Sequence, residues 1–245
     1  MEIDPHAVAE PVVNYAILHD DRTFAASSFA TAIQLNNEGV HSIVLGQHRE
    51  ALSAFLNGLS LLRNINNITL EDRESDCSEE PSCFLHFECH KDAVTKKEAS
   101  DHATFVFKSP IIFRQHSLQQ TSYDSLCFNM MYNIALSNHL LGMEGGMSLE
   151  ALRKALAIYE LAYNSQRRRG TSLPTMQVIA IMNNVGQINS VLQNQERANS
   201  CFNHLMTVIF SLVSRGRGQT IVQLDGFVRN LAPILFKQPS SAPAA

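Results

Sequence analysis

Apolar residues recur along much of this chain at the spacing of helices that bury one face. Over residues 22–45 the intervals predict a helix with a buried stripe, and a partner helix is predicted over 47–65. Similar patterns predict helices over 122–141, 149–166, 175–191 and 195–214. The apolar pattern of 222–236 predicts a last helix that caps the end of the array. The sequence therefore predicts an all-α fold.

The two ends of the chain lack this pattern. Residues 1–21 mix Pro5 and Pro11 with a short apolar run, and we treat them as an N-terminal arm. Residues 237–245 are mainly alanine, serine and proline, which predicts a disordered tail. A single helical domain is thus predicted over 22–236.

A long insertion, residues 66–120, separates the first predicted helix pair from the rest. We expect it to be partly disordered, near 71–82 and about 91–103, because long segments without helical or strand patterning are uncommon inside compact domains. The stretch FVFKSPIIF, residues 105–113, differs because it is β-branched and aromatic around Pro110. This composition predicts an extended segment that docks on the helices.

Two parts of the helical region repeat one spacing plan. In NNEGVHSIVLGQHREALSAF, residues 36–55, Gly39 is followed by an alanine twelve residues later and a phenylalanine sixteen residues later. In NNVGQINSVLQNQERANSCF, residues 183–202, Gly186 is followed by the same residue types at the same intervals. Small residues on two helices let their backbones approach, and the aromatic ring fills the remaining gap. Each stretch is therefore predicted to form a helical hairpin.

A third, degraded copy lies between them. Ala135 takes the glycine position, and Gly142 follows it by seven residues, as the predicted turn residue Gly46 follows Gly39. After an insertion over 144–151, the second helix carries an alanine and a tyrosine in the positions of the alanine and phenylalanine. The three hairpins are thus expected to share one architecture.

These spacings of small residue, turn glycine, alanine and aromatic resemble the tetratricopeptide repeat, a helix-turn-helix unit. The usual tryptophan is replaced by Leu35, Met131 and Met182, and the helix-ending proline is absent. The patterns NNxG, xxYNxAL and AxxCFxxL also resemble those of uncharacterised tetratricopeptide-like proteins of diatom type. The resemblance covers 30–213 with a gap and implies a short right-handed superhelix of hairpins. It implies no particular activity.

In such a superhelix the inner face of each first helix would carry the function. The candidate groove residues there are Asn36, Asn37, Val40, Ile43, Tyr132, Asn133, His139, Asn183, Asn184 and Gln187. An asparagine side chain both donates and accepts, so a row of them could hold an extended peptide backbone without demanding its sequence. Alternatively, the asparagines tie neighbouring helices together. Segment 105–113 is itself a candidate occupant, as a built-in plug or as part of the core.

Composition narrows the class of partner. The chain has 245 residues, 45% of them hydrophobic, and a formal net charge of −4, which argues against a general nucleic-acid binder. No signal region and no membrane-length apolar run occur, and five cysteines are expected to be reduced, which favours a cytoplasmic or nuclear location. We expect a protein or peptide partner, no nucleic acid, no membrane and no cofactor.

Two other classes of function stay open as alternatives. A zinc-supported regulatory module would use Cys77, Cys83, His86, Cys89 and His90, although their spacing matches no zinc-finger pattern. A small hydrolase would use Cys127 or His139, but these residues lie twelve positions apart on one predicted helix. A non-enzymatic interaction scaffold is therefore the expected function.

Overall fold

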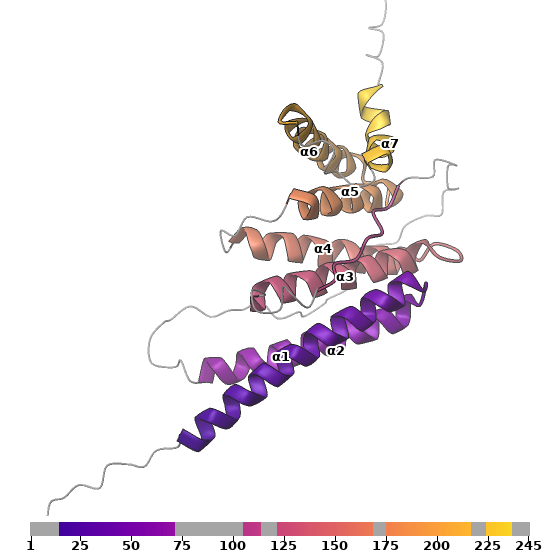
Figure 1. Cartoon of the computed structure of the whole chain (residues 1–245). Helices are drawn as coiled ribbons and strands as arrows, with labels where there is room; N and C mark the ends of the chain where they lie inside the picture. The colour runs from indigo at the N-terminus through magenta and orange to yellow at the C-terminus, as the bar shows by residue number, and fades with distance from the viewer. Residues whose placement is uncertain (1–14, 72–104, 114–121, 169–174, 217–223, 237–245) are drawn as a thin grey trace, which may run out of the picture.

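A computed structural model of the chain describes residues 15–71, 105–113, 122–168, 175–216 and 224–236. Within these residues the chain forms seven helices, stacked from α1 and α2 at one end to α6 and α7 at the other (Figure 1). Their bounds are α1 Tyr15–Val44, α2 His48–Glu71, α3 Tyr123–Met143, α4 Leu149–Arg168, α5 Thr175–Val191, α6 Gln195–Ser214 and α7 Leu224–Leu235. The predicted all-α fold of sequential hairpins is confirmed.

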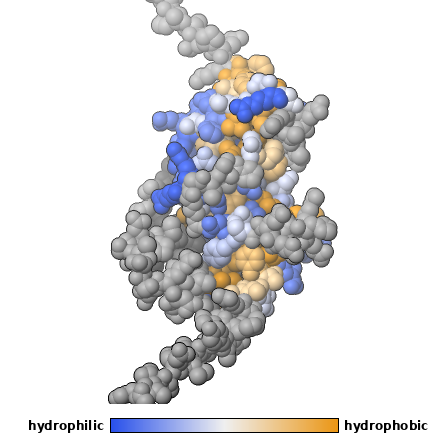
Figure 2. All heavy atoms as spheres, turned by 60° about the vertical axis from the view of Figure 1, so that its left-hand side comes forward, coloured by the Kyte–Doolittle hydropathy of each residue, from blue (hydrophilic) through white to orange (hydrophobic). Residues whose placement is uncertain are grey.

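Consecutive helices pair along the stack. The closest packing joins α1 to α2, α3 to α4 and α5 to α6, and α7 packs on α6 and α5 at the far end. The surface at this end, at the height of α7 in Figure 1, carries apolar residues with hydrophilic residues beside them (Figure 2). The insertion between the first and second hairpins brings segment 105–113 back onto the helices (Figure 1).

Two helices are longer than the apolar pattern indicated. Helix α1 begins at Tyr15, so part of the expected arm is helical, and α2 continues to Glu71, beyond residue 65. Both extensions are free of glycine and proline, the residues that most often end a helix. Neither extension needs a buried stripe, because a helix that is already nucleated adds residues at little cost. The expected disorder near 71–82 and 91–103 falls almost entirely outside the described residues.

The first and third hairpins share their turn geometry. Gly46 has φ +74°, and Gln193, which holds the same place after Gly186, has φ +61°. In both turns a backbone N–H reaches five residues back, from Gln47 to Ser42 and from Asn194 to Asn189, at 2.8 Å. The left-handed residue is therefore a property of the turn itself, and the glycine at position 46 adopts it without strain.

The middle hairpin turns differently. Gly142 was expected in the turn, but it lies inside α3, buried against Leu152, where an added Cβ would come within 2.6 Å of the leucine side chain. The left-handed backbone falls instead at Gly145 and Met147. The inserted residues lengthen the loop, so α3 continues to Met143 before the chain reverses. The small residue is used here for close packing rather than for a turn.

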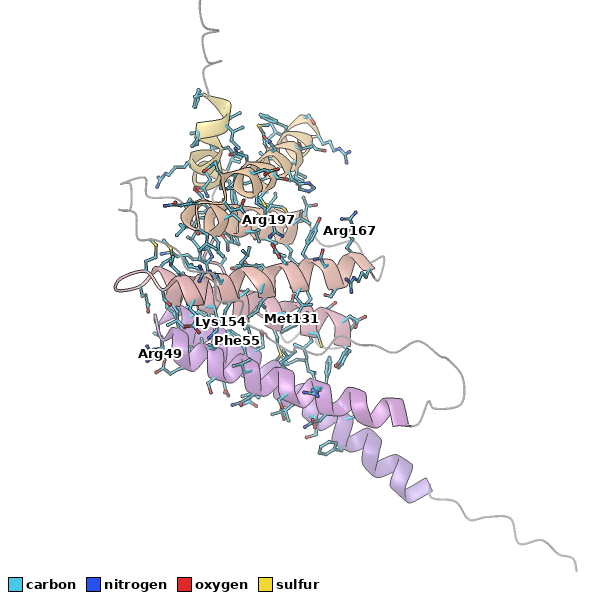
Figure 3. The ribbon with its side chains drawn as sticks, turned by 180° about the vertical axis from the view of Figure 1, so that it is seen from behind. Arg49, Phe55, Met131, Lys154, Arg167 and Arg197 are labelled. Atoms are coloured by element: carbon cyan, nitrogen blue, oxygen red, sulfur yellow. The ribbon has the colours of Figure 1, made fainter. Side chains whose placement is uncertain are left out.

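The glycines of the first helices allow the predicted close approach. A Cβ at Gly39 would lie 2.5 Å from Cε1 of Phe55, and one at Gly186 would lie 2.6 Å from Cε1 of Phe202. Phe55 is fully buried between α1 and α2 (Figure 3). The repeated interval between glycine and phenylalanine thus reflects one packing contact that the two hairpins share.

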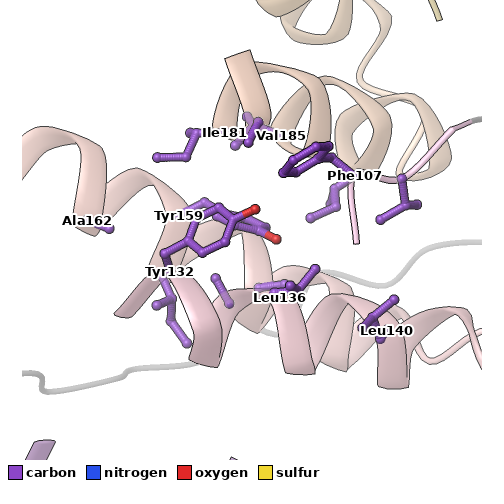
Figure 4. Close-up of a cluster of buried hydrophobic side chains, with 14 of the residues drawn as sticks. Phe107, Tyr132, Leu136, Leu140, Tyr159, Ala162, Ile181 and Val185 are labelled. Atoms are coloured by element: carbon purple, nitrogen blue, oxygen red, sulfur yellow. The ribbon is translucent and has the colours of Figure 1, made fainter. Parts of the chain in front are cut away.

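Two tyrosines fill the centre of the stack. Tyr132 on α3 and Tyr159 on α4 are buried with an edge-to-face contact, their ring centroids 5.7 Å apart (Figure 4). Ile181 and Val185 of α5 cover them from the next hairpin, and Phe107 of the extended segment lies beside the same cluster. The segment is thus part of the main core.

Candidate functional site

Segment 105–113 lies across the first helix of every hairpin. It starts beside α7, passes α5 and α3, and ends beside α1, against the order in which the chain forms these helices (Figure 1). All nine of its residues lack helix and strand pairing. Its backbone N–H and C=O groups are therefore available to side chains.

Four asparagines hold this backbone by the same pair of hydrogen bonds. The Oδ1 of each accepts from the N–H of one segment residue, and its Nδ2 donates to the C=O of that same residue. The pairs, with N–H and C=O distances, are Asn230 with Phe105 (2.8 and 2.7 Å), Asn184 with Phe107 (2.9 and 3.0 Å), Asn133 with Ile111 (2.8 and 2.9 Å) and Asn37 with Phe113 (3.0 and 2.9 Å). A carboxamide suits this contact because it offers one donor and one acceptor side by side.

The spacing of the held residues follows from extended geometry. Phe105 and Phe107 are two apart, as are Ile111 and Phe113, so each pair presents its backbone groups on the same side of the segment. Between the pairs lies Pro110, which has no N–H to be held. The segment is thus fixed by asparagines near both ends, and between them lies a span, called the unheld span, that no asparagine bonds.

A second set of asparagines bridges these contacts. Asn36 donates to the carbonyl of Ile111 at 3.1 Å and accepts from Asn133 at 2.9 Å. Asn183 likewise donates to the carbonyl of Phe105 at 3.1 Å and accepts from Asn230 at 2.8 Å. We call Asn36, Asn37 and Asn133 the α1-side clamp, and Asn183, Asn184 and Asn230 the α7-side clamp. Each clamp joins two first helices and one end of the segment.

Apolar side chains anchor the same segment. Phe105 and Phe107 both contact Phe227 of α7, with ring centroids 5.3 and 5.4 Å apart. At the other end Phe113 is buried in a smaller core cluster, between α1, α2 and α3, with Ile33 and Leu126. Backbone bonds and side-chain burial therefore act together at both ends.

Of the ten predicted groove residues, five asparagines bond directly to the segment. Tyr132 adds a long bond from its hydroxyl to the carbonyl of Ser109, at 3.4 Å. Val40 and Ile43 are buried in the core, and His139 and Gln187 bond to each other. The asparagines therefore hold an extended segment of this same chain and also tie neighbouring helices together.

Asn230 is a site residue that the predicted groove set does not include. Its signal is present in the sequence, because each first helix carries an asparagine two residues before a glycine or alanine, and α7 has the same arrangement in Asn230 and Ala232. The apolar pattern of 222–236 alone predicts a capping helix and gives no role to this polar position. Helix α7 therefore has the features of a fourth first helix.

Three buried ionisable groups near the segment, those of His139, Tyr132 and Tyr159, have pKa shifts that favour their neutral forms. Burial lowers the pKa of His139 to about 4, although its 2.6 Å bond from Nε2 to the Gln187 Oε1 opposes that shift. Burial also raises the pKa of both Tyr132 and Tyr159. The neighbouring Tyr159 raises the pKa of Tyr132 further. These three buried side chains thus offer hydrogen bonds and apolar contact rather than charge, while the exposed Lys108 adds to the lowering of the His139 pKa.

The residues of the two alternative functions are placed as follows. Burial raises the pKa of Cys127 to about 11, and twelve residues of helix put it ~18 Å along the axis from His139. Cys77, Cys83, His86, Cys89 and His90 lie outside the described residues. Within the described ranges there is no group of three or more potential metal ligands. No helix in that part of the chain is long and apolar enough to span a membrane.

Comparisons with models of known families, with curated proteins and with solved structures find no match for this chain. The structure defines the class of protein as all-helical, built of paired antiparallel helices.

Proposed function

We propose that this protein is a tetratricopeptide-like interaction module whose two clamps bind an extended segment of a protein partner, and that segment 105–113 is the internal occupant of that groove. The observation that carries this proposal is the repeated pair of hydrogen bonds between an asparagine side chain and the backbone N–H and C=O of one residue. Because these bonds use only backbone groups, another extended chain can make them equally well.

The apolar anchors define what such a partner must provide. Val106, Phe107 and Phe113 are buried, whereas Lys108 is exposed in the unheld span. A partner segment therefore needs apolar residues at the positions of these three anchors and tolerates polar residues and proline between them. It must also displace a tethered competitor, whose effective concentration is on the order of millimolar.

The test uses a labelled peptide with the sequence of residues 104–114. Fluorescence anisotropy compares its binding to the intact chain and to the Phe107→Ala chain, in which the internal segment is held less firmly. We expect at least tenfold tighter binding to the variant. Circular dichroism checks that the variant is folded, and Phe105→Ala provides a second, milder weakening of the segment.

Backbone recognition is then tested on the peptide itself. N-methylation at Phe107 removes the N–H that Asn184 receives and should weaken binding by at least tenfold, since a buried acceptor loses its partner. N-methylation at Lys108, whose N–H is not received by either clamp, is the matched control and should have little effect. The proposal fails if neither the folded Phe107→Ala chain nor the folded Phe105→Ala chain binds the peptide. It also fails if the two methylated peptides bind with the same affinity.

A complementary test changes the protein. Replacing Asn36, Asn133 and Asn183 by alanine should reduce peptide binding while the helical signal is nearly kept. If the triple variant instead melts with the loss of its helical signal, the asparagines serve the framework alone. That result would contradict the proposal.

A further inference from the structure

Helix α7 has the sequence and the contacts of a first helix, but no second helix accompanies it among the described residues. The four first helices share an asparagine followed two residues later by a small residue, at Asn37 and Gly39, Asn133 and Ala135, Asn184 and Gly186, and Asn230 and Ala232. All four asparagines make the same pair of hydrogen bonds to the segment. Their helices are therefore equivalent in orientation as well as in sequence.

In the three complete hairpins the small residue is covered by the second helix. Gly39 and Gly186 are buried directly beneath the rings of Phe55 and Phe202. In the middle hairpin Ala135 is fully buried, and Tyr159 holds the aromatic position on α4. Each second helix supplies an alanine and, four residues later, an aromatic residue. One packing rule is thus used three times in this chain.

Among the described residues no second helix covers the corresponding face of α7, where Ala232 is partly buried. Alignment on the clamp asparagines places Val228 and Ala232 where α5 has Met182 and Gly186. Met182 packs against the core, whereas Val228 is 41% exposed. Leu235 on the same stripe, one turn beyond Ala232, is 42% exposed, and apolar residues lie beside hydrophilic ones on the surface at this end (Figure 2).

The neighbouring helix α6 also exposes apolar residues. Phe210 and Val213 of α6 are 57% and 48% exposed. A helix that ends a stack usually presents a polar outer face to water, since an exposed apolar face costs free energy and promotes association. Helix α7 covers α5 and α6, but it leaves an apolar stripe of its own.

We propose that the stripe formed by Val228, Ala232 and Leu235 binds an amphipathic helix of a partner protein, one that carries an alanine and an aromatic residue four positions apart. On α5, the face that corresponds to this stripe is covered by α6. We infer the occupant from this packing, because a helix like α6 would cover the stripe on α7 in the same way. The ring of the partner enters above Ala232 and completes a fourth hairpin. This site lies on the face of α7 away from Asn230 and does not depend on the proposed function of the groove.

The probe is a labelled synthetic peptide with the sequence of α6, residues 195–214, which contains Ala198 and Phe202 in the required spacing. Fluorescence anisotropy measures its binding to the full chain. A peptide with Phe202→Ala is the matched control, and we expect it to bind at least tenfold more weakly, because the ring supplies the contact over the small residue.

Two protein variants address the site. Ala232→Trp fills the position of the incoming ring, and Leu235→Asp places a charge on the stripe without touching Phe227 or Asn230. Each should weaken binding of the α6 peptide at least tenfold. Lys154→Trp, on the exposed face of α4, is the control for an added ring and should bind normally. Circular dichroism and melting temperature establish that the variants are folded.

Three results would overturn this proposal. The first is a folded chain that does not bind the α6 peptide. The second is binding that Ala232→Trp and Leu235→Asp both leave unchanged. The third is a dimer of the chain in sedimentation equilibrium that Leu235→Asp disperses, since a second copy would then be the occupant of the stripe.

Discussion

The two clamps apply one hydrogen-bond pattern to opposite ends of the same segment, yet their surroundings differ. In the α7-side clamp Asn183 and Asn184 are fully buried, and Asn184 also donates to the hydroxyl of Tyr159 at 3.0 Å. In the α1-side clamp Asn36 and Asn133 are fully buried too, and the difference lies at Asn37, which is only partly buried. It borders an open cavity of about 580 Å³, which Phe113 also lines.

This difference gives the same bonds a different energetic weight. A hydrogen bond that is lost in a buried site leaves unsatisfied groups without water, whereas water can replace part of a bond at the surface. The α7-side clamp should therefore fix the segment, and the α1-side clamp should open first. A partner that replaces the segment would begin at the Phe113 end.

The largest effect is expected from the aromatic anchor of the α7 side. Phe227→Ala removes the ring that contacts both Phe105 and Phe107 and should lower the free energy of unfolding by about 4 kcal/mol. Phe113→Ala, at the α1 side, should cost about half as much, because the adjoining cavity lets the site relax. Urea denaturation of the full chain measures both. Equal losses would remove the distinction between the clamps.

The asparagines provide a direct comparison of the two clamps. Asn184→Ala leaves the N–H and C=O of Phe107 and the hydroxyl of Tyr159 without a partner, and should cost about 3 kcal/mol. Asn37→Ala removes the equivalent pair of bonds near water and should cost about 1 kcal/mol. Hydrogen exchange of the Phe107 and Phe113 amides should show the same order. A larger loss for Asn37→Ala would reverse our assignment of the firmer clamp.

Beneath the clamps the two repeated hairpins should behave alike. Gly39→Ala and Gly186→Ala force a Cβ against the Phe55 and Phe202 rings, and each should cost about 2 kcal/mol, partly offset by the better helix propensity of alanine. Gly58→Ala is the control, because its Cβ meets chiefly the flexible end of Met130. Thermal melts of the three variants measure these differences. A cost at only one of the first two sites would show that the hairpins are packed differently.

The smallest expected effect is a pH dependence from His139. Its pKa is lowered to about 4 in the folded chain from the ordinary histidine value of 6.5, so the unfolded state binds more protons between these values. The contribution of His139 to the free energy of unfolding is fully present above pH 6.5. It is lost as the pH falls, by about 1 kcal/mol between pH 6.5 and 5.5. His139→Gln should flatten this slope in urea titrations, whereas His204→Gln, on the exposed face of α6, should not. An unchanged slope in His139→Gln would assign the pH dependence to other groups.

The candidate site was partly readable from the sequence. The row of Asn37, Asn133 and Asn184 followed from the repeat alignment, since identical positions in stacked hairpins face the same way. Asn230 was missed because α7 has no second helix in the sequence pattern to mark it as part of a repeat. The role of Gly142 was misjudged for a related reason, since an inserted loop changes where a helix ends without changing the spacing before it.

The sequence by itself determined the helices and their pairing, because the contacts that define them are local. Gly39 and Phe55 lie on one hairpin, and the apolar stripes need only the period of the helix. Only the tertiary structure decided which backbone the asparagines hold. Asn37 and Phe113 are 76 residues apart, and Asn230 and Phe105 are 125 apart. A carboxamide fits any extended backbone, so nothing in the sequence around an asparagine selects the backbone that it holds. The stacking of the helices and the burial of the segment's aromatic side chains make that selection.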